Sequence, residues 1–270
     1  MQALNIVKFA VIAAAVSVAA GCGGLPEKND ETATWNNNKL YAEAKEALDG
    51  NDYSKCAKYF ERLEGRDPFG PFAQQAQINV AYCNWKDNET AAAEQGIDRF
   101  IKLHPDHPSI DYAYYLKGLI DFNDDLGLFG RFSGQDLSDR DPKALRDSYD
   151  SFKIVVDRYP QSKFAPDSAQ RMRYIVNALA KHEVHAAEYY QRRGAYVAAI
   201  NRAQMALKDY QGAPATEDAL QVMVQSYQAL GQQQLADDTR RVMASTFPDS
   251  PYLTGRSRNR APDRHWWQLW

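Results

Sequence analysis

Residues 53–68 have the sequence YSKCAKYFERLEGRDP, and residues 90–105 have the sequence TAAAEQGIDRFIKLHP. Both stretches carry small or apolar residues at helical spacing and end on a proline, which cannot continue a helix. The two prolines are 37 residues apart, and self-similarity at a fixed spacing of about 20 to 50 residues is typical of repeat proteins. The same ending recurs at Asp67-Pro68, His104-Pro105, Tyr159-Pro160 and Phe247-Pro248, and Tyr210-Gln211 is a fifth instance without the proline.

A further amphipathic segment precedes each of these stretches. In the first unit, Leu40, Ala44 and Ala47 share one face of a predicted helix, and Gly50 to Asp52 end it before the second helix begins. Each unit is therefore predicted to be a helix-turn-helix whose two helices approach closely at a small residue. These small positions are Cys56, Ala93, Ser148, Ala199 and Ala236.

The pattern resembles the tetratricopeptide repeat, whose second helix begins with a small residue and ends near a proline. One such unit cannot bury its apolar stripe alone, so neighbouring units must stack to form a core. We therefore predict an all-α fold, an α-α superhelical solenoid of five tetratricopeptide-like helix-turn-helix repeats over residues 35–252. The third repeat is enlarged by a Gly- and Asp-rich loop at residues 124–141, which we expect to be ordered and packed across a groove.

The N-terminus has the features of an export signal. An apolar run of 12 small or hydrophobic residues begins at Phe9, which is too short to span a bilayer but suits a signal peptide. The run ends in the motif AAGC, which resembles a bacterial lipobox and implies acylation of Cys22. Residues 1–21 are thus predicted to be a lipoprotein signal peptide and residues 22–34 a flexible tether. The alternative is a plain signal peptide cut after Gly21, which leaves Cys22 as a free thiol.

Composition and motifs argue against several classes of function. The chain has 32 Lys and Arg residues against 35 Asp and Glu residues, a net charge of -3, which does not suit a nucleic-acid-binding protein. His182 and His185 are three residues apart, whereas the helical zinc motif needs a spacing of four. With no phosphate-binding Gly-rich loop and no nucleophile motif in the sequence, we predict no enzyme, no metal site and no cofactor other than the lipid on Cys22.

Two cysteines are placed on helices that should be neighbours. Cys56 lies on the second helix of the first unit, and Cys83 lies on the first helix of the second unit. A disulfide between them is one expectation for an exported protein. The other is a pair of buried thiols that act as small apolar side chains.

Four longer stretches are distinctive: RDPFGPFAQQAQ (66–77), DRFIKLHPDHPSIDYAYYLKGL (98–119), SDRDPKALRDSYDSF (138–152) and AEYYQRRGAYVAAINR (187–202). They resemble the BamD family, also called ComL, the lipoproteins of the outer-membrane β-barrel assembly machine. The resemblance implies a non-catalytic scaffold that is lipid-anchored to the periplasmic face of the outer membrane of a Gram-negative bacterium. It implies as partners the periplasmic POTRA domains of BamA, BamC and BamE where present, unfolded outer-membrane β-barrel proteins, and membrane lipid through the acyl anchor.

The resemblance also implies roles for individual residues. Arg202 and Asn201 match the fourth repeat, which faces BamA in the family, whereas Phe69, Phe72 and Gln75 match the groove that binds client proteins. The alternative for Arg202 is a solvated helix face. The alternative for the two phenylalanines is packing between repeats.

The C-terminal tail, residues 253–270, departs from the family pattern because it contains four arginines and three tryptophans. We expect it to fold back onto the last helix or to be disordered. Contact with a membrane surface is a second interpretation, since arginine attracts anionic headgroups and tryptophan favours the interface. A third is mimicry of a client, whose aromatic end Trp270 would imitate.

One other function fits a repeat lipoprotein of this kind, namely association with peptidoglycan or with a pilus secretin. Recovery of a BamA homologue in a pull-down would favour the assembly scaffold. Sedimentation with cell wall would favour the alternative.

Overall fold

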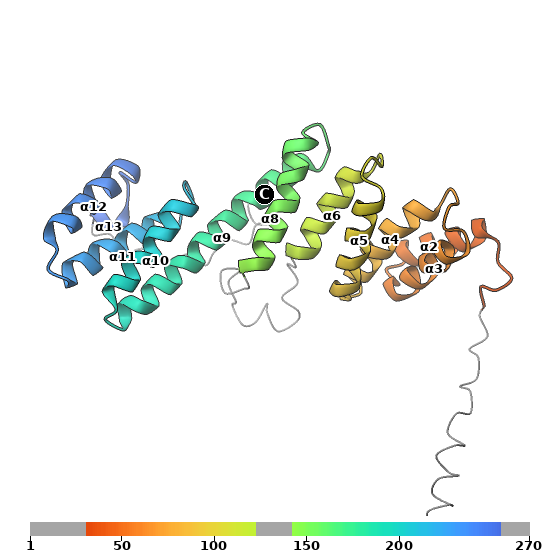
Figure 1. Cartoon of the computed structure of the whole chain (residues 1–270), viewed down its shortest axis with the longest axis horizontal. Helices are drawn as coiled ribbons and strands as arrows, with labels where there is room; N and C mark the ends of the chain where they lie inside the picture. Colours follow the sequence, from red (N-terminus) through yellow and green to blue (C-terminus); the bar gives the residue numbers. More distant parts are fainter. Residues whose placement is uncertain (1–30, 123–141, 255–270) are drawn as a thin grey trace, which may run out of the picture.

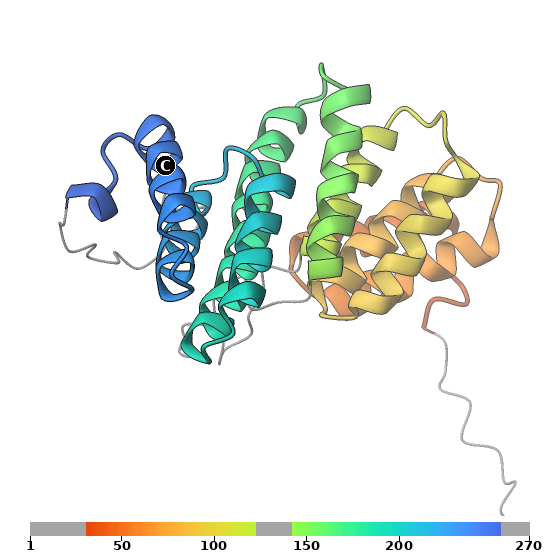
Figure 2. The same ribbon diagram turned by 60° about the vertical axis from the view of Figure 1, so that its left-hand side comes forward.

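A computed structural model describes residues 31–122 and 142–254 of the 270-residue chain, and all regular structure in these two ranges is helical. The helices form successive pairs that follow one another along the long axis of the molecule (Figure 1). A view turned by 60° shows the pairs stacked side by side (Figure 2). The helices are α2 (Asn37–Asp49), α3 (Tyr53–Arg66), α4 (Ala73–Lys86), α5 (Thr90–Leu103), α6 (Ile110–Phe122), α8 (Pro142–Arg158), α9 (Ala165–Arg192), α10 (Tyr196–Asp209), α11 (Thr216–Ala229), α12 (Gln233–Thr246) and α13 (Pro251–Thr254).

Five helix pairs make up the solenoid: α2/α3, α4/α5, α6/α8, α9/α10 and α11/α12. This confirms the predicted fold class. The second helix of each pair carries one of the predicted small residues, and all five of these side chains are fully buried. They are the predicted positions Cys56, Ala93, Ser148, Ala199 and Ala236.

The turn inside four of the pairs is closed by one residue in the left-handed conformation, two positions before the second helix. Asn51, Asn88, Gly194 and Gly231 have φ angles of 59°, 65°, 75° and 71°. In each turn the next residue donates its N–H to the carbonyl five residues earlier, at 2.8 to 3.0 Å. This is the Schellman pattern, which favours glycine or asparagine at the left-handed position.

The third pair is held together by a close approach instead. The Ser148 hydroxyl on α8 donates to the carbonyl of Gly118 on α6 at 2.8 Å. A Cβ at Gly118 would lie 2.6 Å from the Phe152 ring, so only glycine fits there. The predicted loop 124–141 between these helices lies outside the described residues.

The core is continuous along the solenoid because each apolar cluster spans neighbouring repeats. One cluster joins α2, α3 and α4, a second joins α4, α5 and α6, a third joins α6, α8 and α9, and a fourth joins α9, α10 and α11. Phe60, Phe100 and Phe152 on the second helices are fully buried in three of them. No repeat therefore has a core of its own, as expected for a solenoid.

The N-terminal boundary of the domain corrects the sequence prediction, which placed residues up to 34 in the tether. Thr32 is fully buried, and Arg66 of α3 donates to its carbonyl at 2.6 Å and to the carbonyl of Trp35 at 2.9 Å. The Tyr59 hydroxyl donates to Glu31 at 2.7 Å. Residues 31–35 pack on α3 because their backbone carbonyls lie outside a helix and need hydrogen-bond donors, which the long Arg66 side chain supplies.

The ends of the chain are described only in part. The predicted signal peptide, Cys22 and the tether as far as residue 30 lie outside the described residues, as does the tail from residue 255 onward. The folded part continues to Thr254, two residues beyond the predicted end, because the Tyr252 hydroxyl of α13 donates to Asp218 of α11. None of the described helices is both long enough and apolar enough to cross a membrane.

Candidate functional site

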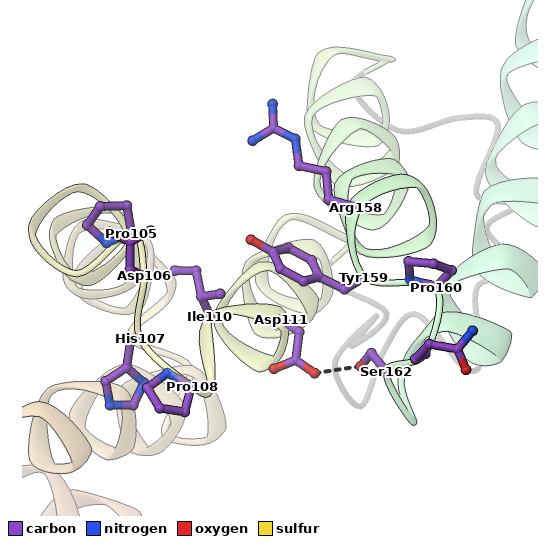
Figure 3. A pocket seen from close by; sticks show the side chains of 11 residues that line it. Pro105, Asp106, His107, Pro108, Ile110, Asp111, Arg158, Tyr159, Pro160 and Ser162 are labelled. Carbon is purple, nitrogen blue, oxygen red and sulfur yellow. Dashed lines mark hydrogen bonds between the residues drawn. The ribbon is translucent and has the colours of Figure 1, made fainter.

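A hollow of about 580 Å³ lies between the α5–α6 turn and the α8–α9 turn. Its two sides come from the ends of the second and third repeats, so that the stretch from Pro105 to Ile110 lies across the hollow from Arg158 and Tyr159 (Figure 3). The lining residues are Pro105, Asp106, His107, Pro108, Ile110, Asp111, Arg158, Tyr159, Pro160, Gln161 and Ser162.

The chemistry of this hollow suits binding. The hydroxyl of Ser162 donates to Asp111 at 2.6 Å (Figure 3), so the serine is paired with a carboxylate and not with a base such as histidine. Burial, with a smaller contribution from His104, lowers the pKa of His107 and so favours its neutral imidazole. Prolines and a tyrosine ring next to Arg158 offer apolar surface with charge at the rim, as peptide-binding surfaces do.

Arg202 on α10 is not a freely solvated side chain. Its Nη1 donates to Oε2 of Glu183 on α9 at 3.0 Å. The Glu183 side chain is 6% exposed and that of Arg202 is 40% exposed. The arginine therefore neutralises a buried carboxylate while part of its guanidinium remains open to solvent, and the neighbouring Asn201 is exposed.

The three residues predicted to line a client groove do not form one surface. The Phe72 ring stacks on Tyr41, with ring centroids 4.6 Å apart, and belongs to the first apolar cluster. The Gln75 amide donates to Asn79 on the same helix at 3.1 Å. Phe69, in the α3–α4 turn, is 100% exposed. Packing therefore explains Phe72, whereas Phe69 remains available for a partner.

Cys56 on α3 and Cys83 on α4 are joined by a disulfide, with their Cα atoms 6.1 Å apart. Both side chains are fully buried in the first cluster. The bond ties the first repeat to the second.

A charged group that no sequence motif predicted lies at the α5–α6–α8 contact. Burial raises the pKa of Asp121 to about 6, and the carboxylates of Glu94, Asp147 and Asp98 add to this effect, which Lys117 opposes. The Lys117 ammonium lies 2.9 Å from Asp98 but 3.6 Å from Asp121 Oδ2. That oxygen accepts no hydrogen bond. Over the described residues, no three His, Cys, Asp or Glu side chains are grouped so as to hold a metal ion.

One sequence signal could have identified Glu183. It lies on the face of α9 that also carries Ala180, Val184 and Ala187, all of which are buried. A carboxylate in an apolar stripe needs a cationic partner. The partner, 19 residues away on the next helix, could not be identified from this signal alone.

Comparison with known proteins places the chain among outer-membrane proteins. Residues 34–243 match the model of the family YfiO, described as "Outer membrane lipoprotein". The chain is 43% identical over 256 residues to a protein named outer membrane protein assembly factor BamD in Neisseria meningitidis serogroup A, with 95% of each chain covered. It is 35% identical to the protein of the same name in Xylella fastidiosa, with 92% of this chain and 84% of the other covered.

Two further matches are more distant in sequence. The protein of that name in Vibrio cholerae is 31% identical, with 85% of this chain and 94% of the other covered. Among solved structures, that of the MamA protein is 11% identical with a TM-score of 0.37, covering 82% of this chain and 95% of the other. A likeness of that size adds nothing to the fold described above.

Proposed function

The chain belongs to the BamD family, the YfiO family of outer membrane lipoproteins, and on this basis we propose that it is a non-catalytic assembly factor for outer-membrane β-barrel proteins. The observation that carries the proposal is the 43% identity to named assembly factors over 95% of the chain. The solenoid is compatible with such a role, since stacked repeats present long surfaces on which several partners can bind side by side.

We further propose that Cys22 is acylated and anchors the protein to the periplasmic face of the outer membrane. The family description as a lipoprotein and the lipobox-like motif support this step. One acyl chain binds a membrane only reversibly, and stable anchoring takes two hydrophobic signals, so a stable anchor requires more than one chain at Cys22. The segment between Cys22 and Glu31 would then link the folded domain to the membrane.

For the BamA periplasmic domains, we propose the exposed face of α10. Val197, Asn201 and Met205 recur every four residues and therefore share one face of this helix. The two apolar side chains are 61% and 41% exposed, and Asn201 between them is also exposed. Arg202, next to this face, adds the open part of its guanidinium. Exposed apolar side chains beside an arginine are typical of the centre of a protein interface.

For unfolded clients, the N-terminal repeats remain the proposed region. Of the three residues expected there, Phe72 is used for packing and Gln75 bonds within its own helix. The hollow at the α5–α6 and α8–α9 turns offers a further surface of suitable chemistry for an extended chain. BamC and BamE, where present, are further proposed partners.

The test is photocrosslinking in intact cells from a photoreactive residue at position 201, which is exposed and forms no ion pair. Position 92 on α5, also exposed, is the matched control. We expect an adduct with the BamA homologue from position 201 and none from position 92. Adducts from position 201 to cell-wall fragments or to a pilus secretin would contradict the proposal and favour the alternative function.

A further inference from the structure

Five turns connect one repeat to the next, or the last repeat to α13, and they share one backbone design. In each turn, the residue that follows the helix accepts a hydrogen bond at its carbonyl from the N–H three residues later. The carbonyl of that third residue then accepts a second bond from the N–H three residues further on, as in Gly70 to Asp67 and Ala73 to Gly70. These ten bonds measure 2.9 to 3.1 Å. The turns begin at Asp67, His104, Tyr159, Tyr210 and Phe247.

The side chain two residues into the turn is therefore directly comparable between repeats. It is polar in three of the turns and glycine in a fourth, and all four residues are exposed. In the first turn it is Phe69, which is 100% exposed. Because four of the five turns form without an apolar group there, the fold does not require the phenylalanine. The four counterparts are Asp106, Gln161, Gly212 and Asp249.

The turn that carries Phe69 is also the one bonded to the segment that leads to the N-terminus. Arg66 donates to the Thr32 carbonyl at 2.6 Å, and Asn37 donates to Asp67 at 3.3 Å. Figure 1 shows the start of the coloured ribbon, before α2, and the α3–α4 connection at the same end of the solenoid. The chain from Cys22 to Glu31 can span about 30 Å at full extension. Both the anchor and Phe69 can therefore reach one membrane surface.

We propose that the α3–α4 turn inserts Phe69 into the lipid interface beside the anchor, so that the first repeat rests on the membrane. The proposal rests on the acylation of Cys22 proposed above. A phenyl ring gains free energy when it leaves water for the acyl-chain boundary. Pro68 and Pro71 fix the backbone on either side of the ring, so little chain entropy is lost on insertion.

Two cations lie beside Trp35, in the segment that precedes α2. The Lys39 ammonium lies 4.6 Å from the centre of the Trp35 ring, and Arg66 brings a second positive charge to the start of the turn. Basic residues near a membrane surface attract anionic headgroups, and tryptophan is enriched at this depth.

The experiment uses the full-length lipidated protein in vesicles of phosphatidylethanolamine and phosphatidylglycerol. With Cys22 acylated and Cys56 bonded to Cys83, the substitution Phe69→Cys introduces a single free thiol. This thiol is labelled with a polarity-sensitive NBD group. The matched control is Asp249→Cys, at the same turn position in the last repeat. We expect the probe at 69 to shift its emission to shorter wavelength and to lose most of it to a shallow nitroxide lipid, while the probe at 249 does neither.

Two results would overturn the inference, and they are distinguishable. If the protein carries its acyl chains by mass spectrometry and floats with the vesicles, but both probes report water, the turn does not touch the membrane and the anchor proposal stands. A photoreactive residue at 69 that then crosslinks to a protein in cells would assign the turn to a protein partner. If the protein carries no lipid and does not float, the anchor proposal fails and the inference fails with it.

Discussion

Replacing Arg202 with alanine should destabilise the fourth repeat, because it leaves the carboxylate of Glu183 buried without its partner. Removing one member of a fully buried ion pair costs about 3 to 5 kcal/mol. The Arg202 side chain is 40% exposed, so water can reach the vacated site and part of that cost is avoided. We therefore expect Arg202→Ala to lower the free energy of unfolding by about 2 kcal/mol.

A double-mutant cycle separates the ion pair from the packing of the two side chains. Glu183→Gln removes the buried charge, so the double variant Glu183→Gln/Arg202→Ala should lose less stability than the two single variants added together. The coupling should be about 1 kcal/mol or more. Asn201→Ala is the matched control, since the residue is exposed, and surface substitutions of this kind usually stay within about 0.5 kcal/mol.

The assay is urea unfolding followed by circular dichroism, together with amide hydrogen exchange of peptides from α9 and α10. Exchange is needed because stability in a solenoid is approximately a sum over repeats, so one repeat can open before the others. The reasoning is refuted if Arg202→Ala exchanges like Asn201→Ala in α9 and α10, or if the cycle is additive. The result also decides whether a loss of partner binding in an Arg202 variant reports an interface or a loosened repeat.

Three further predictions concern stability. Reduction of the Cys56–Cys83 bond should lower the free energy of unfolding by about 3.5 kcal/mol on the chain-entropy model for residues 27 apart, measured as a shift of the urea midpoint with and without reductant. Gly118→Ala should cost about 1 to 3 kcal/mol through overpacking, whereas Gly65→Ala, with open space around it, should stabilise the protein by about 0.5 to 1 kcal/mol; thermal melts compare the two. The pKa of Asp121 is raised to about 6 in the folded protein, against 3.8 for the unfolded chain, so the folded state binds this proton more tightly. The contribution of Asp121 to the free energy of unfolding is therefore fully present below about pH 4 and is lost as the pH rises through 6. The Asp121→Asn variant should not show this loss, which urea unfolding curves of the wild type and the variant at pH 4 and pH 7.5 would measure. If the free energy of unfolding falls equally in both proteins between these pH values, the prediction is wrong.

The repeat architecture was predictable because its determinants are local. A buried small residue marks the second helix of each pair, and Asn51 or Gly194 marks the left-handed turn that precedes a second helix. The pairing of Glu183 with Arg202 and the docking of residues 31–35 on α3 were not predictable in the same way. Both depend on which side chains the stacked helices bring together, and several donors in the sequence are equally suitable for each acceptor.

The client groove illustrates the same limit. Phe69 and Phe72 are three residues apart in a matching stretch, yet one is stacked in the core and the other is in solvent. Both lie in the turn between α3 and α4, where the backbone directs their side chains differently. A resemblance to a family predicts which segment is equivalent but not where its side chains point. A resemblance therefore identifies the region better than the residues.

Repeats within one chain provide an internal control for separating fold from function. Arg202 lies three residues after the small position of its repeat, and the equivalent side chains in the other four repeats are uncharged. Because the same helix pair forms four times without a charge at this place, the buried pair with Glu183 is an addition to the repeat and not a requirement of it. This ion pair occurs in the repeat whose α10 exposes Val197 and Met205. It fixes the position of Arg202 beside these two side chains, as the proposed partner surface requires. The uncharged equivalents are Tyr59, Gly96, Ser151 and Thr239.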